Sequence, residues 1–114
     1  MKPWDYGRLQ VAENQRYLAN GSQPFFWLGD TAWLLFEKLT DEEIQVYLKN
    51  RSHKHFNVIQ ATLVHGSAPG LDRFVDHDFA QPNEGSEYWT RVDRAVAAAE
   101  ELGIYMALLP AWGS

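Results

Sequence analysis

Phe56-Asn57-Val58-Ile59-Gln60-Ala61-Thr62-Leu63-Val64 is the stretch of sequence that decides the fold. It is a mostly apolar run rich in β-branched residues, which favour strands. A continuous run, as opposed to an alternating one, is typical of a strand buried on both faces, as in a parallel sheet. Two other runs have this character, Phe25-Phe26-Trp27-Leu28-Gly29 and Ile104-Tyr105-Met106-Ala107-Leu108-Leu109. The sequence therefore predicts three buried strands.

Helical segments separate these strands. Thr40 and Glu43 form a capping box, in which each side chain bonds the other residue's backbone N–H, and acidic residues fill the first turn. This pattern predicts a helix over residues 41–53. Four residues share one of its faces at helical spacing: Ile44, Tyr47, Leu48 and Arg51.

A further helix is predicted over residues 87–102. Ser86 can cap its start, and Gly103 suits the position just past its end. A shorter helix is expected over residues 31–38. The inner face of the helix over 87–102 is predicted to consist of Trp89, Val92, Val96 and Ala99.

The order strand, helix, strand, helix, strand indicates right-handed crossovers and a parallel sheet. A complete (β/α)8 TIM barrel takes ~250 residues. The chain has 114 residues, so the predicted fold is α/β, the N-terminal part of a TIM barrel with about three βα units. A small β-hairpin element precedes it, with a turn at Asn20-Gly21. We expect one truncated domain, with the leading hairpin over 1–24 and the first three barrel strands with their helices over 25–114.

Composition excludes several classes of function. Ten Lys and Arg stand against 15 Asp and Glu, a net charge of −5, whereas nucleic-acid binding needs clustered positive charge. The chain has no Cys, so disulfides and thiolate metal sites are excluded. Its apolar run over 104–109 is far shorter than the roughly 20 residues of a membrane span. No signal peptide follows Met1, so we expect a cytoplasmic protein. An open sheet edge predicts self-association.

Candidate binding residues stand at the carboxyl ends of the predicted strands, where such folds bind ligands. A carboxylate, an amide, an imidazole and two indoles facing one cleft suit a sugar, because hydroxyls need planar polar partners and the ring stacks on Trp. The predicted substrate-binding residues are Asp30, Trp33, Gln60, His65 and Trp112.

Each of these residues also has a structural interpretation. Asp30 can cap the following helix, and Gln60 can be a buried amide bonded to a neighbouring strand. Trp33 and Trp112 can be core residues. His65 at a strand end can be either functional or structural.

Two sequence features resemble metal ligands. His53-Lys54-His55 lies at a helix end, where positive charge favours the helix dipole. Asp76-His77-Asp78 lies in a long loop over residues 66–85 and lacks further ligands. We therefore expect no metal and no cofactor.

Glycoside hydrolysis usually needs two carboxylic groups roughly 5 to 9.5 Å apart. Asp30 is the only carboxylate among the strand-end residues, so we assign no catalytic residue to the chain, unless the loop over 66–85 contributes.

Several motifs resemble the apiosidase-like glycoside hydrolases, in consistent order along nearly the whole chain. The family's opening segment matches at Pro3-Trp4-Asp5-Tyr6-Gly7-Arg8-Leu9-Gln10-Val11 and Asn14-Gln15-Arg16-Tyr17-Leu18. Its first barrel strand matches at Pro24-Phe25-Phe26-Trp27-Leu28-Gly29-Asp30-Thr31-Ala32-Trp33. Its second strand matches at Phe56-Asn57-Val58-Ile59-Gln60-Ala61. Its third matches at Leu102-Gly103-Ile104-Tyr105 together with Leu109-Pro110-Ala111-Trp112-Gly113.

The resemblance implies a TIM-barrel glycosidase that acts on side chains of plant polysaccharides, such as apiose-containing pectin. It also implies that the catalytic acid and the nucleophile or base lie on later strands, and that Asp30, Trp33, Gln60 and Trp112 line the cleft. A non-catalytic carbohydrate-binding module and an inactive fragment are the alternatives.

Overall fold

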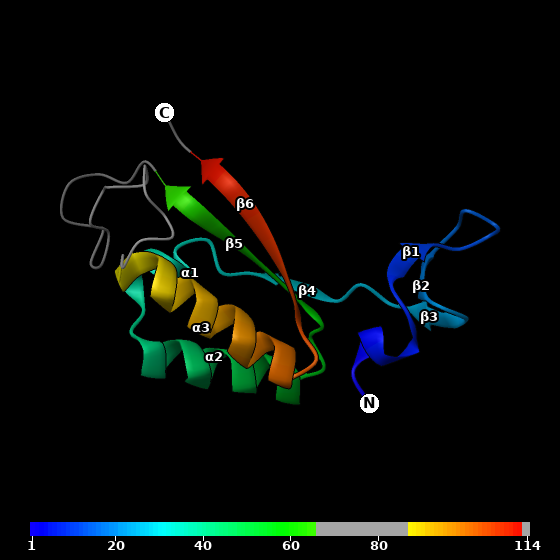
Figure 1. The fold of residues 1–114 in the computed structure, drawn as a ribbon, viewed down its shortest axis with the longest axis horizontal. Helices are drawn as coiled ribbons and strands as arrows, with labels where there is room; N and C mark the ends of the chain where they lie inside the picture. The colour runs from blue at the N-terminus through cyan, green and yellow to red at the C-terminus, as the bar shows by residue number, and fades with distance from the viewer. Residues whose placement is uncertain (66–86, 113–114) are drawn as a thin grey trace.

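The computed structural model describes residues 1–65 and 87–112 of the chain. Within these residues the strands form two three-stranded sheets, and the α-helices lie together on one face of the second (Figure 1). A 3-10 helix, η1 (Pro3–Tyr6), precedes the first strand. None of the described helices is long and apolar enough to cross a membrane.

The N-terminal sheet is antiparallel. It consists of β1 (Leu9–Val11), β2 (Leu18–Asn20) and β3 (Gln23–Phe25), with β2 in the centre. The turn between β2 and β3 contains Gly21, whose φ of 56° is readily adopted by glycine. The predicted leading hairpin is therefore present and carries a third strand.

The second sheet is parallel. It consists of β4 (Gly29–Thr31), β5 (Val58–His65) and β6 (Tyr105–Trp112), with β5 between the other two. Helices α1 (Leu35–Lys38) and α2 (Asp41–His53) connect β4 to β5, and α3 (Glu87–Glu101) precedes β6. This confirms the predicted α/β fold with parallel strands and intervening helices.

The first barrel strand begins later than the apolar run predicts. Phe25 ends β3, and the next two residues lie on the surface, with Phe26 79% and Trp27 51% exposed. The side chain of Asn57 holds this linker: its amide donates to the carbonyl of Phe26 (2.6 Å), and its oxygen accepts from the N–H of Leu28 (2.8 Å). One side chain from a distant segment thus takes the place of ladder hydrogen bonds, which no local pattern indicates.

The core lies between the parallel sheet and the helices. Ile44 and Leu48 of α2 are buried there, as predicted, together with Ile59 of β5. The inner face predicted for α3 is wrong at Val96, which is 38% exposed and lines a hollow beside β6. The buried face of α3 includes three alanines, of which the first two also line a hollow shared with α2: Ala95, Ala98 and Ala99.

The N-terminal sheet closes the amino end of the parallel sheet. Tyr105, the first residue of β6, packs edge-on against the rings of Trp4 (5.1 Å between centroids) and Phe25 (5.5 Å). Its hydroxyl accepts a hydrogen bond from the buried amide of Asn20 (2.9 Å), which also donates to the carbonyl of Gly7 (3.0 Å). The carboxyl ends of β5 and β6 point away from this contact (Figure 1).

Candidate functional site

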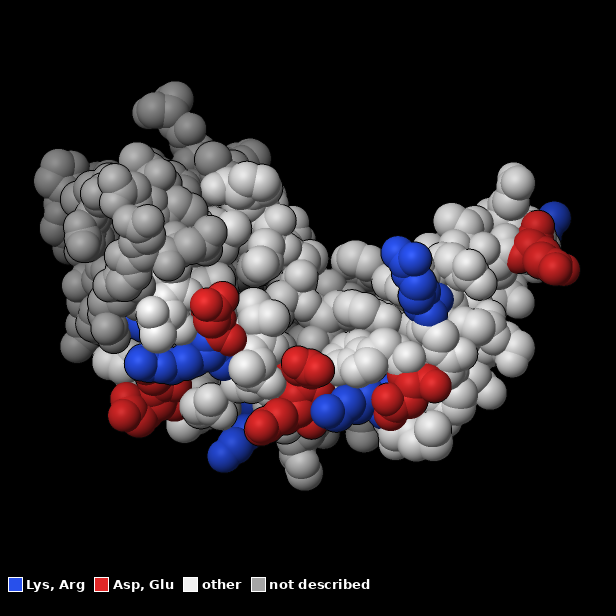
Figure 2. Space-filling model, in the orientation of Figure 1, with Lys and Arg blue, Asp and Glu red and all other residues white. Residues whose placement is uncertain are grey.

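The register of the parallel strands divides their residues between two faces. Asp30, Ile59 and Met106 stand at one level, and Thr31, Gln60 and Ala107 at the next. Because side chains alternate along a strand and Ile59 is buried in the helix-covered core, Gln60 projects to the opposite side. We call this side the open face and define it by Thr31, Gln60, Thr62, Ala107 and Leu109. Figure 2 shows the surface hollowed between the parallel sheet and the N-terminal sheet.

Gln60 stands at the centre of the open face. It lies on the middle strand, between an exposed Thr31 and a half-buried Ala107. Both neighbours are small, so they leave room beside the amide. The half-buried Gln60 side chain forms no hydrogen bond within the part of the chain that the structure describes, and the structural interpretation of a satisfied amide does not apply there. Its donors and acceptor are available to a ligand.

Trp33 lies next to β5, above the end of β4. The N–H of Ala32 donates to the carbonyl of Gln60 (2.8 Å), and the N–H of Thr62 donates to the carbonyl of Trp33 (3.4 Å). This extends the pairing of the two strands by two residues. The half-buried Trp33 is therefore brought to Thr62, two residues beyond Gln60 on the same face.

Thr62 was not among the predicted substrate-binding residues. It is fully buried, and its hydroxyl has no hydrogen-bond partner among the described residues. A buried hydroxyl without a partner costs about 1 to 3 kcal/mol, so such a group marks a place where a ligand or water can compensate. The sequence contains a pattern that places Thr62 beside Gln60, because residues two positions apart in a strand lie on the same face.

His65 and Trp112 are register partners at the carboxyl ends of β5 and β6. Their backbones lie side by side, although the two residues are 47 positions apart in the chain (112 − 65). The structure thus brings two predicted site residues to the same end of the sheet.

Asp30 lies apart from Gln60, on the side of the sheet that α2 covers. Its carboxylate pairs with Nε of Arg51 (2.7 Å) and accepts a hydrogen bond from the hydroxyl of Tyr47 (2.7 Å). The guanidinium of Arg51 also stacks over the rings of Tyr47 and Phe56, 5.0 and 5.5 Å from their centroids. Asp30 does not cap α1, since that helix begins at Leu35 without a side-chain cap. These contacts tie α2 to β4.

The partners of Asp30 were missed by sequence reasoning. Tyr47 and Arg51 stand four residues apart on the inner face of α2. A phenol and a guanidinium on an inner helix face indicate a polar partner nearby, because buried polar groups need hydrogen bonds. A polar pair there requires a partner on the sheet, and Asp30 is that partner.

The ionisation of Tyr47 reports on this cluster. Burial, followed by the hydrogen bond to Asp30, raises the pKa of Tyr47 from 10.0 to about 12. A side chain whose pKa is higher in the folded state than in the unfolded state stabilises the fold at pH values below its unfolded pKa. This stabilisation is lost as the pH rises through the pKa of the folded state. Between pH 10 and pH 12 the wild type is expected to lose more stability than Tyr47→Phe, as measured by urea unfolding at each pH. Tyr17→Phe, on an exposed ring, is the matched control and should follow the wild type.

The described residues contain no group of three or more His, Cys, Asp or Glu side chains that could hold a metal ion. His53 and His55 are exposed at the end of α2 and just beyond it, at the amino end of β5. Asp76-His77-Asp78 and the rest of the loop over 66–85 lie outside the described residues, as does Ser86.

Solved structures that are similar to the chain define its class of protein. A solved glycoside hydrolase superposes on 99% of the chain with a TM-score of 0.84 and 33% sequence identity. A glycoside hydrolase family 5 structure from Bacteroides vulgatus ATCC 8482 covers 100% of the chain with a TM-score of 0.83 and 31% identity. The endo-1,4-beta-mannanase of Rhizomucor miehei covers 86% with a TM-score of 0.63 and, at 16% identity, shares the fold alone. The fold is that of the N-terminal part of a TIM-barrel glycoside hydrolase.

The family follows from the sequence. Residues 12–114 match the model of the apiosidase-like catalytic domain, so the chain belongs to the apiosidase-like family. It spans 27% of the length of the first two solved relatives. A search of curated protein sequences gave no match.

Proposed function

We propose that the chain supplies the first part of the substrate-binding wall of an apiosidase-like glycoside hydrolase that acts on side chains of plant polysaccharides. The observation that carries this proposal is the unsatisfied amide of Gln60 at the centre of the open face, in a chain of this family. Trp33, His65 and Trp112 are proposed to extend the wall toward the carboxyl ends of the strands.

Hydrolysis is proposed to depend on two carboxylic groups from barrel strands outside the matched portion. Two observations support this. The open-face residues of the described strands include no carboxylate, and Asp30 is engaged by α2. The solved relatives extend well beyond the matched portion, since the chain covers only 27% of them. The chain by itself is accordingly expected to show no turnover of an aryl apioside. Measurable turnover would contradict this part of the proposal.

Binding can be tested directly on the chain. Titration with methyl apioside, followed by NMR, is expected to show saturable binding that Gln60→Ala weakens by about tenfold, the effect of about 1.4 kcal/mol of lost hydrogen bonding. Gln45→Ala, on the exposed side of α2, is the control and should bind as the wild type does. Equal affinities of the wild type and Gln60→Ala would exclude the open face as the binding site.

A non-catalytic sugar-binding role is the second candidate. The absence of a carboxylate from the described open face favours it equally. Joining the chain to the remaining strands of a solved relative distinguishes the two candidate functions. Turnover by the joined protein that decreases on Gln60→Ala supports the enzyme. Binding without turnover supports the non-catalytic sugar-binding role.

A further inference from the structure

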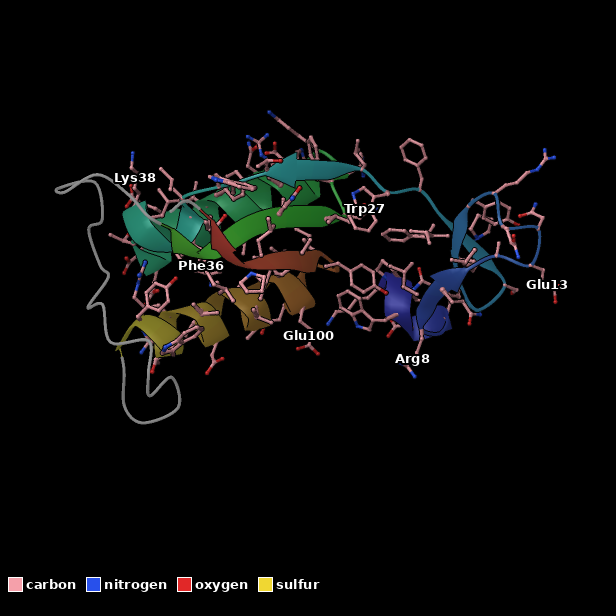
Figure 3. The ribbon with its side chains drawn as sticks, turned by 90° about the horizontal axis from the view of Figure 1, so that it is seen from above. Arg8, Glu13, Trp27, Phe36, Lys38 and Glu100 are labelled. Carbon is pink, nitrogen blue, oxygen red and sulfur yellow. The ribbon has the colours of Figure 1, made fainter. Side chains whose placement is uncertain are left out.

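Another hollow lies on the N-terminal sheet, remote from the open face. It has a volume of about 710 Å³ and is bounded by β1, β2 and the turns that join the strands. Figure 3 shows Glu13, one of its lining residues, at the tip of the β1–β2 hairpin, at the opposite end of the molecule from Phe36 and Lys38. The carboxyl ends of β5 and β6 also point away from this sheet (Figure 1).

Small residues make the floor of this hollow. Ala19 is buried in the central strand and is paired with Gln10 on one side and Pro24 on the other. Ala12, Gly21 and Ser22 continue the lining at the two turns. Because these positions carry no large side chains, the surface of the sheet is lower here than at the larger side chains around the hollow.

Polar side chains and one aromatic ring form the rim. The ring of Tyr17 is 47% exposed. Gln10, Glu13, Tyr17 and Ser22 form no side-chain hydrogen bonds within the described residues, and no Lys or Arg lines the hollow. An amide, a carboxylate and hydroxyls around an exposed ring match a ligand with many hydroxyl groups and one apolar face. Without positive charge, the rim does not suit an anion.

The hairpin that carries the rim is held in one conformation. The N–H of Ala12 donates to the carbonyl of Tyr17 (2.9 Å), and the N–H of Gln15 donates back to the carbonyl of Ala12 (2.8 Å). The side chain of Asn14 accepts from the N–H of Arg16 (3.1 Å). Gln15 has a φ of 60°, which costs a non-glycine residue about 1 to 2 kcal/mol. A strained turn fixed by local hydrogen bonds gives a preorganised rim, which reduces the entropic cost of binding.

We propose that this hollow is a secondary binding site for a neutral oligosaccharide, with Tyr17 as the stacking platform and Gln10, Glu13 and Ser22 as hydroxyl partners. The site holds a carbohydrate chain at a distance from the open face. It does not depend on Gln60, so this proposal and the proposed function can fail separately.

Calorimetric titration of the chain with a neutral glucan or xylan hexasaccharide and with a galacturonan hexasaccharide of equal length tests the proposal. The neutral sugar is expected to bind about tenfold more tightly, because Glu13 and the net charge of −5 repel the anion. Tyr17→Ala should weaken neutral-sugar binding by about tenfold through loss of stacking, and Gln10→Ala by about threefold. Glu13→Gln should reduce the difference in affinity between the neutral and the anionic hexasaccharide.

Two control variants complete the experiment. Phe26→Ala removes an exposed ring outside this hollow, and Gln45→Ala alters an exposed amide on α2 that lies outside both proposed sites. Both should leave the affinity for the neutral hexasaccharide unchanged, and the melting temperature of each variant checks its fold. The proposal is overturned if Gln10→Ala and Tyr17→Ala bind as the wild type does, if the anionic sugar binds equally well, or if Gln60→Ala abolishes the binding.

Discussion

Replacing Arg91 with methionine is expected to lower the free energy of unfolding by about 3 kcal/mol. Arg91 stands on the inner face of α3 and is 4% exposed. Its guanidinium donates to the carbonyl of Phe36 (2.9 Å) and to the carbonyl of Leu39, and its Nε lies 3.7 Å from the carboxylate of Asp41. One side chain thus binds α1, the α1–α2 connection and the first turn of α2.

The expected size follows from what methionine leaves behind. Methionine fills a similar volume, so little packing is lost. The two carbonyls lose their donor in a place where water has poor access, and each unsatisfied buried group costs about 1 to 3 kcal/mol. Asp41 retains Arg94 as a partner, which limits the electrostatic part of the loss.

Arg94 provides the matched control. It lies three residues further along α3 and pairs with the same carboxylate at 2.7 Å, although its side chain is 53% exposed. Exposed ion pairs contribute about 0 to 1 kcal/mol. Arg94→Met should therefore have a small effect in urea unfolding although its ion pair is the shorter of the two. Equal losses of unfolding free energy in the two variants would show that the ion pair with Asp41 is the stabilising contact, and not the hydrogen bonds from Arg91 to the two carbonyls.

The parts of the fold that the sequence predicted well depend on local signals. Helix α2 begins and ends at the predicted residues, Asp41 and His53, because its capping box is formed by Thr40 and Glu43, three positions apart. Gly103, predicted just past α3, has a φ of 75°. Each of these features involves neighbours in sequence, so a residue pattern can contain it.

The errors involve contacts between distant segments. The strand expected at residues 25–29 divides between two sheets because Asn57, about 30 positions away, binds its backbone. Val96 is exposed because its position on α3 faces the outer side of β6.

The candidate site shows the same division. Strand alternation places Gln60 and Thr62 on one face, and this could be inferred from the sequence. The position of Asp30 could not, because the sequence pattern of a buried strand is the same for either face. The choice between faces is decided by Tyr47 and Arg51, which reach Asp30 from α2.

Gly21→Ala is expected to have the second large effect, a loss of about 3 to 4 kcal/mol, from backbone strain together with overpacking. Gly21 has a φ of 56°, and a Cβ atom there would lie 2.2 Å from the carbonyl oxygen of Tyr6. Backbone cannot move aside as a flexible side chain does, so η1 and the β2–β3 turn must separate. That movement also pulls on Asn20, whose amide joins Gly7 to the hydroxyl of Tyr105.

Gly103→Ala separates the two contributions to this loss. Gly103 has a φ of 75°, but a Cβ atom there would meet its nearest neighbour, the Cδ of Pro3, at an ordinary 3.5 Å. This variant carries the backbone strain without the clash, so about 1 to 2 kcal/mol should be lost. Urea unfolding of both variants measures the difference. The NMR signal of the indole N–H of Trp4, whose ring packs on Tyr105, shows whether the N-terminal sheet has left the parallel sheet. If the two variants lose equal stability and the Trp4 signal keeps its native chemical shift, the close approach of Gly21 to η1 does not hold the two sheets together.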